Sequence, residues 1–263
     1  MNVLVLGKKG WLGGIFYDYL KKNNINVSYT NQNINLIESF NPDIDVVANF
    51  AASASIDWCE KNKNMAFENN VLGALNLAKL CSRISAKYVF ISSACIFQSN
   101  NENDIQYEDA IPRPGCFYTE TKLMAERLIK ELLTNYLIVR LRLPVSEVPH
   151  PRNALNKLST YSKLVNTQES ATVVEDFIPR LFDLIKNNEV GDFNLINEGT
   201  ISPAQIGNMI GSKFEVFTKD NLDKEMNNEG RAHRVSTVAG TKFGYLPPIQ
   251  ERIVEVVNRW KNG

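Results

Sequence analysis

The sequence predicts an α/β fold in which a doubly wound parallel sheet is followed by a smaller C-terminal region. Two observations lead to this prediction. Short apolar runs bounded by turn residues alternate with segments of helical periodicity along much of the chain. The first of these runs also leads directly into a helical segment through a loop rich in glycine. Strands that alternate with helices pair in parallel, because each helix returns the chain to the end of the sheet at which the preceding strand began.

The expected strands are apolar runs that end at turn residues: 3–6, 26–30, 45–50, 88–92, 137–143 and 193–196. The helices expected between them have apolar residues at helical spacing: 11–20, 65–82 and 122–133. After Arg142 prolines interrupt the alternation, and a helix is expected over 154–164. The Ser202-Pro203 pair is a helix-start signature, with Ser as the cap, and Gly211 is expected to end that helix. A proline pair at 247–248 precedes a last amphipathic helix.

The loop after the first run reads Gly7-Lys8-Lys9-Gly10-Trp11-Leu12-Gly13-Gly14, a G-x-x-G-x-x-G pattern. Glycine at these positions permits a tight turn and lets a pyrophosphate approach the backbone N–H groups at the positive end of a helix. Such turns also arise for packing reasons, but the position directly after the first strand favours a Rossmann-type dinucleotide site. The cofactor contacts expected from this loop come from Gly7, Lys8, Lys9, Gly10, Trp11, Leu12 and Gly13.

The choice of cofactor depends on the end of the second strand, Ser28-Tyr29-Thr30-Asn31, which has no acidic residue to hold a free ribose 2′-hydroxyl. Lys8 and Lys9 are available to a 2′-phosphate instead. We therefore expect NADPH, and NADH stays possible because both lysines could point into water. Further cofactor contacts are expected after the third and fifth strands, from Asn49, Phe50, Ala51, Ala52, Leu143 and Val145, and also from Tyr118 and Lys122.

A Ser, a Tyr and a Lys follow in an order typical of carbonyl reduction. Tyr118 and Lys122 have the i, i+4 spacing that places both side chains on one helix face. A phenol with a pKa of about 10 is a slow acid at neutral pH, unless a nearby cation such as Lys122 lowers that pKa. Ser93 ends the fourth expected strand, where ligands bind in open parallel sheets. We expect Tyr118 to protonate a substrate oxygen that Ser93 holds.

Bulk properties argue against several classes of partner. The 29 basic and 29 acidic side chains leave no net charge, so no long-range field favours nucleic acid or an anionic membrane. No apolar stretch is long enough for a membrane span, and the chain opens on a strand rather than on a signal peptide, so we expect a cytoplasmic protein. The four cysteines lack a metal-ligand spacing and are expected to be reduced thiols, with no metal site.

Cys95 lies two residues after Ser93. If the extended backbone persists over these residues, both side chains point the same way, because strand side chains alternate between faces. Free cysteines are usually small buried residues. A thiol beside a reductase triad instead suggests a second proton-transfer step on the same substrate.

Several short motifs occur in order along the chain: the glycine loop at 7–14, Asp57-Trp58-Cys59-Glu60, Asn70-Val71-Leu72-Gly73, Ala94-Cys95-Ile96-Phe97, Phe117-Tyr118, Leu141-Arg142-Leu143-Pro144 and Pro151-Arg152-Asn153. With them the sequence resembles the extended short-chain dehydrogenase/reductase family, and within it the sugar-nucleotide reductases related to dTDP-4-dehydrorhamnose reductase. It is most similar to the bifunctional nucleotide-rhamnose synthases. This resemblance implies a 3,5-epimerase and 4-reductase that converts UDP-4-keto-6-deoxy-D-glucose to UDP-L-rhamnose.

The resemblance also assigns residues. Ser93, Tyr118 and Lys122 match the reductase triad, with Ser in place of the more frequent Thr. Cys95 matches the epimerase cysteine, and Lys157 matches the lysine proposed as its partner. A C4 ketone acidifies the C–H bonds at C3 and C5, so a thiolate on one face could remove a proton while an ammonium on the other face returns one. Epimerisation must come first, because reduction destroys the ketone.

Substrate contacts are expected from Ser93 and Cys95 at the sugar. Arg152, Asn153 and Arg231 are expected near the diphosphate, since Arg forms bidentate contacts with phosphate oxygens. The sequence does not decide between a uracil and a thymine base.

The expected organisation has a cofactor-binding domain over residues 1–143, to which 191–200 return, and a mainly substrate-binding region with the C-terminal helix over 144–190 and 201–263. The resemblance also implies a possible homodimer, since relatives pair through helices that here include residues 65–82 and 118–133.

Two other functions stay open. The first is a dTDP-4-dehydrorhamnose reductase without epimerase activity, for which Cys95 would be dispensable. The second is a regulatory subunit that binds NADP without turnover, as the regulatory β subunit of methionine adenosyltransferase does. The complete set of Ser93, Tyr118 and Lys122 argues against the second.

Overall fold

The computed structural model describes residues 1–228 and 236–262. The chain divides into two compact units. The first unit comprises Met1–Ser93, Cys116–Arg140 and Phe182–Phe193, and the second comprises Ala94–Gly115, Leu141–Leu181 and Asn194–Gly263. The boundaries of these units differ from those expected for the cofactor- and substrate-binding domains. Residues 94–115, for example, belong to the second unit, although they lie within the expected cofactor-binding domain over 1–143.

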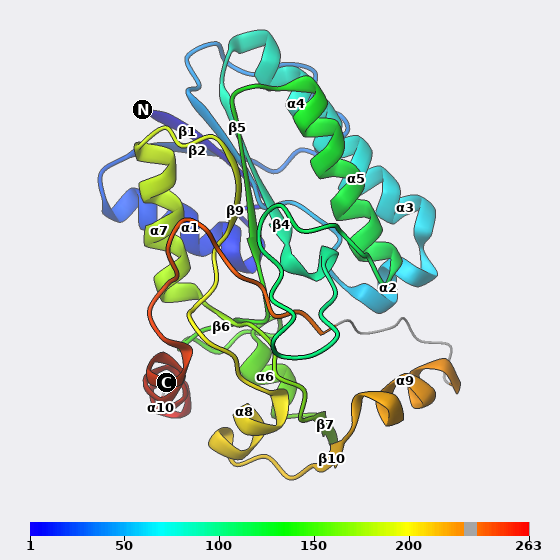
Figure 1. Cartoon of the computed structure of the whole chain (residues 1–263). Coiled ribbons are helices and arrows are strands. Elements are labelled where there is room, and N and C mark those ends of the chain that lie inside the picture. The colour runs from blue at the N-terminus through cyan, green and yellow to red at the C-terminus, as the bar shows by residue number, and fades with distance from the viewer. Residues whose placement is uncertain (229–235, 263) are drawn as a thin grey trace. The chain divides into compact units, whose positions relative to one another are not determined.

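The first unit is built on a six-stranded sheet of order β2-β1-β3-β4-β5-β9 (Figure 1). β1 pairs in parallel with both β2 and β3, and β3 pairs in parallel with β4. The α/β fold with a doubly wound sheet is therefore confirmed. The strands are β1 (Asn2–Leu6), β2 (Asn26–Thr30), β3 (Val46–Asn49), β4 (Lys87–Ser93), β5 (Tyr136–Leu141) and β9 (Gly191–Asn194).

Helices cover both faces of this sheet. On one face α4 (Gly73–Ile84) and α5 (Phe117–Leu132) pack against alternate residues of the strands, such as Leu4, Leu6 and Tyr88. On the opposite face lies α1 (Trp11–Lys22), as Figure 1 shows. Since both faces are covered, β4 is buried along its whole length.

The helix expected over 65–82 consists of three segments: α3 (Lys63–Phe67), a π-helical turn η1 (Glu68–Leu72) and α4. A π-turn inserts an extra residue into a helix and occurs often at functional sites. Here it accompanies Asn70, whose side-chain amide donates to Ser53 O (3.0 Å) and to Thr121 Oγ1 (3.0 Å). Asn70 thus ties the helix to the loop after β3 and to α5. A short helix, α2 (Ile56–Lys61), lies between that loop and α3.

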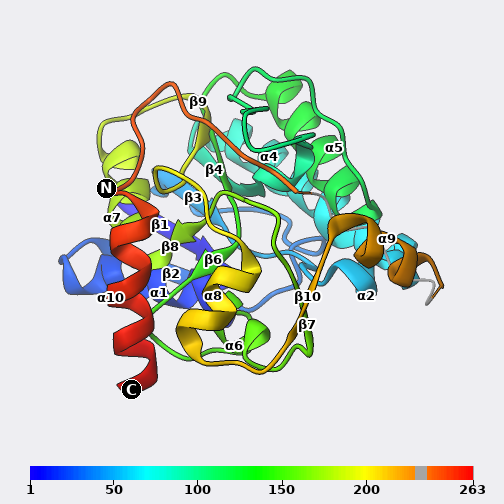
Figure 2. The same cartoon turned by 60° about the horizontal axis from the view of Figure 1, so that its bottom comes forward.

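The second unit contains two small parallel pairs of strands and several helices. β6 (Pro144–Val145) pairs with β8 (Thr172–Val173), and β7 (Lys163–Val165) pairs with β10 (Glu215–Phe217). Its other elements are the 3₁₀ turn η2 (Ala94–Ile96), α6 (Ala154–Leu158), α8 (Pro203–Ile210), α9 (Lys219–Asn228) and α10 (Ile249–Asn262). Figure 2 shows α8 between α6 and α10, and α8 contacts both. α7 (Val174–Lys186) runs from the second unit into the first.

The helix expected over 154–164 is wrong in its second half, because α6 ends at Leu158. The hydroxyls of Ser159 and Thr160 donate to the carbonyls of Asn156 (2.9 Å) and Lys157 (2.8 Å), which ends the helix. Residues 163–165 then form β7.

The expected start and end of α8 are confirmed. The Ser202 hydroxyl accepts from Gln205 N (3.1 Å), and the Gln205 side chain accepts from Ser202 N (2.8 Å), so the two residues form a capping box. Gly211 ends the helix with a left-handed φ of 79°.

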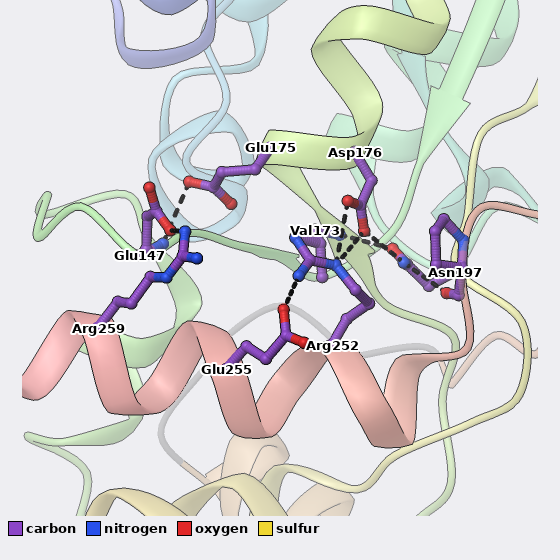
Figure 3. A network of polar contacts seen from close by, with 9 residues as sticks. Glu147, Val173, Glu175, Asp176, Asn197, Arg252, Glu255 and Arg259 are labelled. Carbon is purple, nitrogen blue, oxygen red and sulfur yellow. Dashed lines mark hydrogen bonds and ion pairs between the residues drawn. The ribbon is translucent and has the colours of Figure 1, made fainter.

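A polar network holds α10 within the second unit (Figure 3). Arg252 Nε donates to Asp176 Oδ2 (3.0 Å), and Asp176 Oδ2 also accepts from Asn197 Nδ2 (2.9 Å). Towards the end of the helix Arg259 pairs with Glu147 at 2.8 Å. None of the helices in the described part of the chain is long and apolar enough to cross a membrane.

Candidate active site

The glycine loop after β1 packs against the chain that closes β3. Gly7 has a φ of 79°, and a Cβ on it would lie 2.7 Å from Ala51 N. A Cβ on Gly13 would lie 2.4 Å from Gly7 O. Real Cβ atoms do not approach backbone atoms this closely, so both positions require glycine. The backbone of the loop is therefore packed directly against the chain that follows β3.

The N-terminus of α1 fits an anion. Its cap is Gly10, which has no side chain to bond the first N–H groups, and its first turn has no acidic residue. The positive end of the helix dipole therefore favours an anion such as a pyrophosphate at this position. Trp11 is buried at the start of this helix, and Leu12 is partly buried. The residues present thus fit a dinucleotide.

Lys8 and Lys9 differ in their surroundings. Lys8 Nζ lies 5.1 Å from the ring centroid of Tyr17 and 5.0 Å from that of Tyr29. Tyr29 belongs to β2, so Lys8 reaches toward the strand whose end approaches the adenosine ribose in this fold. Lys9 is exposed. Lys8 therefore does not simply point into water, since its ammonium lies over two tyrosine rings.

Asn49 shapes the end of β3. Its buried side chain donates to Tyr88 Oη (2.9 Å) and accepts from Ala51 N (2.9 Å). Phe50 packs on Phe16 of α1 with 5.3 Å between the ring centroids. Phe50, Ala51 and Ala52 are all partly buried beside the glycine loop.

Tyr118 and Lys122 lie one turn apart on α5, as expected. The helix begins at Phe117, earlier than the periodicity predicts, because two hydrogen bonds stabilise its start. Phe117 N donates to Glu60 Oε2 (3.1 Å), and Cys116 N donates to Thr119 Oγ1 (3.2 Å). Burial would raise the pKa of Glu60, but hydrogen bonds from Lys63 and from Phe117 N lower it, so the anion stays at the helix N-terminus.

Lys122 is buried, with 3% of its surface exposed. Its Nζ donates to Ile91 O (2.8 Å) and lies 4.5 Å from the ring centroid of Phe90, both on β4. Burial lowers the pKa of Lys122 from its ordinary value of 10.5 to about 8. The side chain is therefore still mainly a cation at pH 7. Ser93 ends the same strand, so one unit contains all three residues of the expected triad.

Cys95 lies in the second unit, and the premise of an extended backbone after Ser93 is wrong. β4 ends at Ser93, and residues 94–96 form a 3₁₀ turn. The alternation of side chains therefore does not extend to Cys95. None of the four cysteines is part of a disulfide, and all four are buried.

Cys95 has a charged neighbour that the sequence did not reveal. It forms a hydrogen bond with Arg142, and Arg142 is also paired with Glu169. Arg142 and Glu169 line a cavity of about 390 Å³ in the second unit, together with Leu143, Leu158, Tyr161 and Lys163 among others. Arg142 directly follows β5, which is a position where ligands bind in open sheets, but no sequence signal pointed to Glu169.

The other predicted site residues of the second unit fall into three groups. Leu143 lines the cavity and has a positive φ of 40°, while Val145 is buried in β6. Lys157 lies on α6 and is exposed, and Arg152 is exposed as well. Burial and the positive charges of Arg152 and Lys157 lower the pKa of His150. Arg231 lies outside the described residues.

Asn153 caps α6. Its side chain donates to Ser146 O (2.8 Å) and Val148 O (3.1 Å), and it accepts from Leu155 N (3.1 Å). These bonds give it a structural role. Its expected contact with a diphosphate stays a prediction. Among the described residues no group of three or more His, Cys, Asp or Glu side chains could hold a metal ion.

Known proteins show what this arrangement resembles. The chain is 28% identical over 282 residues to the bifunctional dTDP-4-dehydrorhamnose 3,5-epimerase/dTDP-4-dehydrorhamnose reductase of Arabidopsis thaliana, with 97% of this chain and 92% of the relative covered. Longer trifunctional relatives from the same plant also match, but the chain spans only 33 to 42% of their length.

Two solved structures share the fold. The UDP-rhamnose synthase from Acanthamoeba polyphaga mimivirus has a TM-score of 0.86 at 23% identity, with 98% of this chain and 99% of the other covered. The dTDP-4-dehydrorhamnose reductase from Bacillus anthracis, solved in complex with NADP, has a TM-score of 0.78 at 21% identity, with 97% and 98% covered.

The model of the RmlD substrate binding domain family matches residues 1–180. The resemblance expected from the sequence motifs is thereby confirmed. The chain belongs to this family of sugar-nucleotide reductases.

Proposed function

We propose that this protein is a bifunctional 3,5-epimerase and 4-reductase that converts UDP-4-keto-6-deoxy-D-glucose to UDP-L-rhamnose with NADPH. The observation that carries the proposal is the buried Lys122 one helical turn from Tyr118, in a unit whose glycine loop fits a dinucleotide. The epimerase half is supported by Cys95 and its charged neighbour Arg142.

In the reductase step, NADPH held by the glycine loop would supply the hydride for C4 of the sugar. Tyr118 donates its phenolic proton to the C4 oxygen, which Ser93 holds by a hydrogen bond. Lys122 stabilises the phenolate that remains. A buried cation does this better than an exposed one, because less water screens its charge.

The cofactor preference rests on Lys8. Its ammonium lies over the ring of Tyr29, and the end of β2 has no carboxylate that would repel a 2′-phosphate. A phosphate near Lys8 would gain a charge-assisted hydrogen bond that NADH cannot form. The remaining loop residues, the residues from Asn49 to Ala52, and Leu143 and Val145 stay predicted cofactor contacts.

In the epimerase step, the thiolate of Cys95 removes the proton from C3 or C5. An S–H bond forms, a C–H bond breaks, and the electron pair moves into an enolate whose negative charge lies on the C4 oxygen. Lys157 then returns a proton to the opposite face, so that the ammonium becomes an amine. Exchange of protons with water restores both side chains, and no electrons are gained or lost.

A product assay tests this function. The purified protein is incubated with UDP-4-keto-6-deoxy-D-glucose or its dTDP counterpart, and with NADPH or NADH. We expect faster oxidation of NADPH with the UDP sugar, and an NMR spectrum of UDP-L-rhamnose. Turnover of only a pre-epimerised dTDP-4-keto-rhamnose would favour the reductase without epimerase activity. Binding of NADP without any turnover would favour a regulatory subunit.

We also propose a homodimer, by analogy with relatives that pair through helices corresponding to α4 and α5. Large apolar side chains are exposed near these helices in the first unit: Met65 (53%), Leu72 (42%) and Met124 (38%). Gel filtration with light scattering would contradict the proposal if it gave the mass of a monomer. A cytoplasmic location, the domain division and the diphosphate contacts of Arg152 and Arg231 remain predictions.

A further inference from the structure

A long loop without regular structure, residues 31–45, connects β2 to β3 in the first unit. Loops of this length are uncommon in compact domains and are often functional. The loop leaves the edge strand of the sheet at Thr30, which is the end of β2 that approaches the adenosine ribose in this fold. Its first residues are polar and exposed: Asn31, Gln32 and Asn33. This part of the loop is therefore the surface that an adenosine beside β2 would meet.

Two isoleucines anchor the loop in the core of the first unit. Ile34 and Ile37 are 8% and 5% exposed, and both belong to the hydrophobic cluster that contains Leu77 of α4. A buried backbone carbonyl needs a hydrogen-bond donor, because water cannot reach it. Asn76 of α4 supplies both donors, since its Nδ2 donates to Ile34 O (2.9 Å) and to Ile37 O (2.9 Å). A primary amide carries two N–H groups, so this one side chain serves both carbonyls.

Gly73 gives the loop the space to approach α4. It lies three residues before Asn76, so the two residues share one face of the helix. A Cβ on Gly73 would lie 2.4 Å from Ile34 Cδ1 and 2.6 Å from Ile34 Cγ1. The φ of Gly73 is −61°, which any residue adopts in a helix. The close approach of Ile34, rather than the backbone conformation, therefore explains glycine at this position.

We propose that Asn76, together with Gly73, holds the 31–45 loop in the arrangement that receives the adenosine half of the dinucleotide. The inference rests on the cofactor part of the proposed function and does not involve the epimerase step. Asn76 acts through the loop and is therefore a positioning residue. If the loop adopts its binding arrangement for only a fraction of the time, the apparent dissociation constant rises by the inverse of that fraction.

A binding measurement without any sugar tests the proposal. Asn76→Asp keeps the shape of the side chain and replaces both donors by an acceptor. Calorimetric titration gives the dissociation constants of NADPH, of NADH and of adenosine 2′,5′-bisphosphate, which has the adenosine end of NADPH but no nicotinamide. We expect all three constants to rise about tenfold or more, since the loop loses two hydrogen bonds. A variant at Lys8 should instead affect NADPH far more than NADH.

Asn23→Asp is the matched control. Asn23 also donates from its side chain to a backbone carbonyl, Tyr19 O (2.8 Å), but at an exposed site before the other end of β2. Its dissociation constants should equal those of the unmodified protein. In the reductase assay Asn76→Asp should raise the KM for NADPH and leave the KM for the sugar and kcat at saturating NADPH unchanged. A purely structural role would lower kcat or leave the KM for NADPH as it is, and either result would overturn the proposal.

Gly73→Ala perturbs the same loop from its other contact, and it decides the matter if Asn76→Asp does not fold. Alanine suits a helix better than glycine, so any loss must come from the contact with Ile34. We expect Gly73→Ala to weaken the binding of adenosine 2′,5′-bisphosphate, and to have no further effect in an Ile34→Ala background, where the colliding atoms are absent. Unchanged binding, or the same loss in both backgrounds, would contradict the proposal. Absence of sugar turnover in the unmodified protein would sink the proposed function but would leave this binding result intact.

Discussion

Replacement of Lys122 by Met should stabilise the protein at neutral pH, although it removes a residue of the proposed triad. Lys122 has a pKa of about 8 in the folded protein and an ordinary value of 10.5. At pH 7 the folded state is thus destabilised by about 3 kcal/mol relative to an uncharged side chain, at 1.36 kcal/mol per pKa unit. Met cannot donate to Ile91 O, and the loss of this 2.8 Å bond costs about 1–2 kcal/mol. The expected net gain is about 1–2 kcal/mol.

The pH dependence has a definite sign. Because the pKa is lower in the folded than in the unfolded state, the unfolded chain binds more protons between about pH 8 and 10.5. The stability contributed by this group therefore rises with pH across that window. At pH 9.5 the burial penalty falls to about 1 kcal/mol, so the advantage of Lys122→Met over the unmodified protein should shrink by about 2 kcal/mol.

Urea unfolding at pH 7 and pH 9.5 measures both values, with the free energy taken from the linear dependence on denaturant. Lys79→Met, the same change at an exposed position of α4, serves as the matched control and should show no such difference between the two pH values. The reasoning is refuted if Lys122→Met is less stable than the unmodified protein at pH 7, or if the difference between the two is the same at both pH values.

Three further outcomes are expected. The reductase rate should fall as the pH rises past about 8, because Lys122 loses its proton there, and a pH–rate profile that stays flat to pH 10 would contradict this. Lys8→Met should weaken NADPH binding about tenfold or more while NADH binding changes little, as measured by cofactor fluorescence, whereas Lys9→Met should have a smaller effect; equal losses for both cofactors would argue against a 2′-phosphate contact. Glu126→Gln should destabilise the first unit by about 3 kcal/mol in urea unfolding, since it leaves part of the charge of the 2% exposed Arg140 uncompensated, and a change below about 1 kcal/mol would be inconsistent with that burial.

The central strands of the sheet (β1, β3, β4 and β5) could be predicted from the sequence because they are buried along most of their length. β4 is a continuous apolar run for this reason, and its bounds agree with the expected ones to within a residue. α7 could not be predicted as easily. It contains Pro179, which in a sequence ends a helix more often than it continues one. The second unit has strands of only two or three residues, which are too short to show a period.

The residues of the candidate site also differ in how well the sequence could relate them to one another. Residues on one helix, such as Tyr118 and Lys122, could be related by spacing alone. The partnership of Arg142 with Glu169 spans 27 residues and exists only through tertiary structure, so no local pattern contains it. The role of Cys95 could be predicted only in part. Its likeness to an epimerase cysteine came from a motif, while the geometric argument failed because the strand ends at Ser93.

The most direct test of the central claim compares three proteins in deuterated water with UDP-4-keto-6-deoxy-D-glucose and NADPH. The unmodified protein should oxidise NADPH and give UDP-L-rhamnose with deuterium at C3 and C5. Tyr118→Phe should introduce deuterium but leave NADPH unoxidised, and Cys95→Ala should introduce none while it still binds NADPH. Deuterium at C3 and C5 in the Cys95→Ala reaction, at the level of the unmodified protein, would contradict the assignment of two activities to this chain through Cys95 and Tyr118.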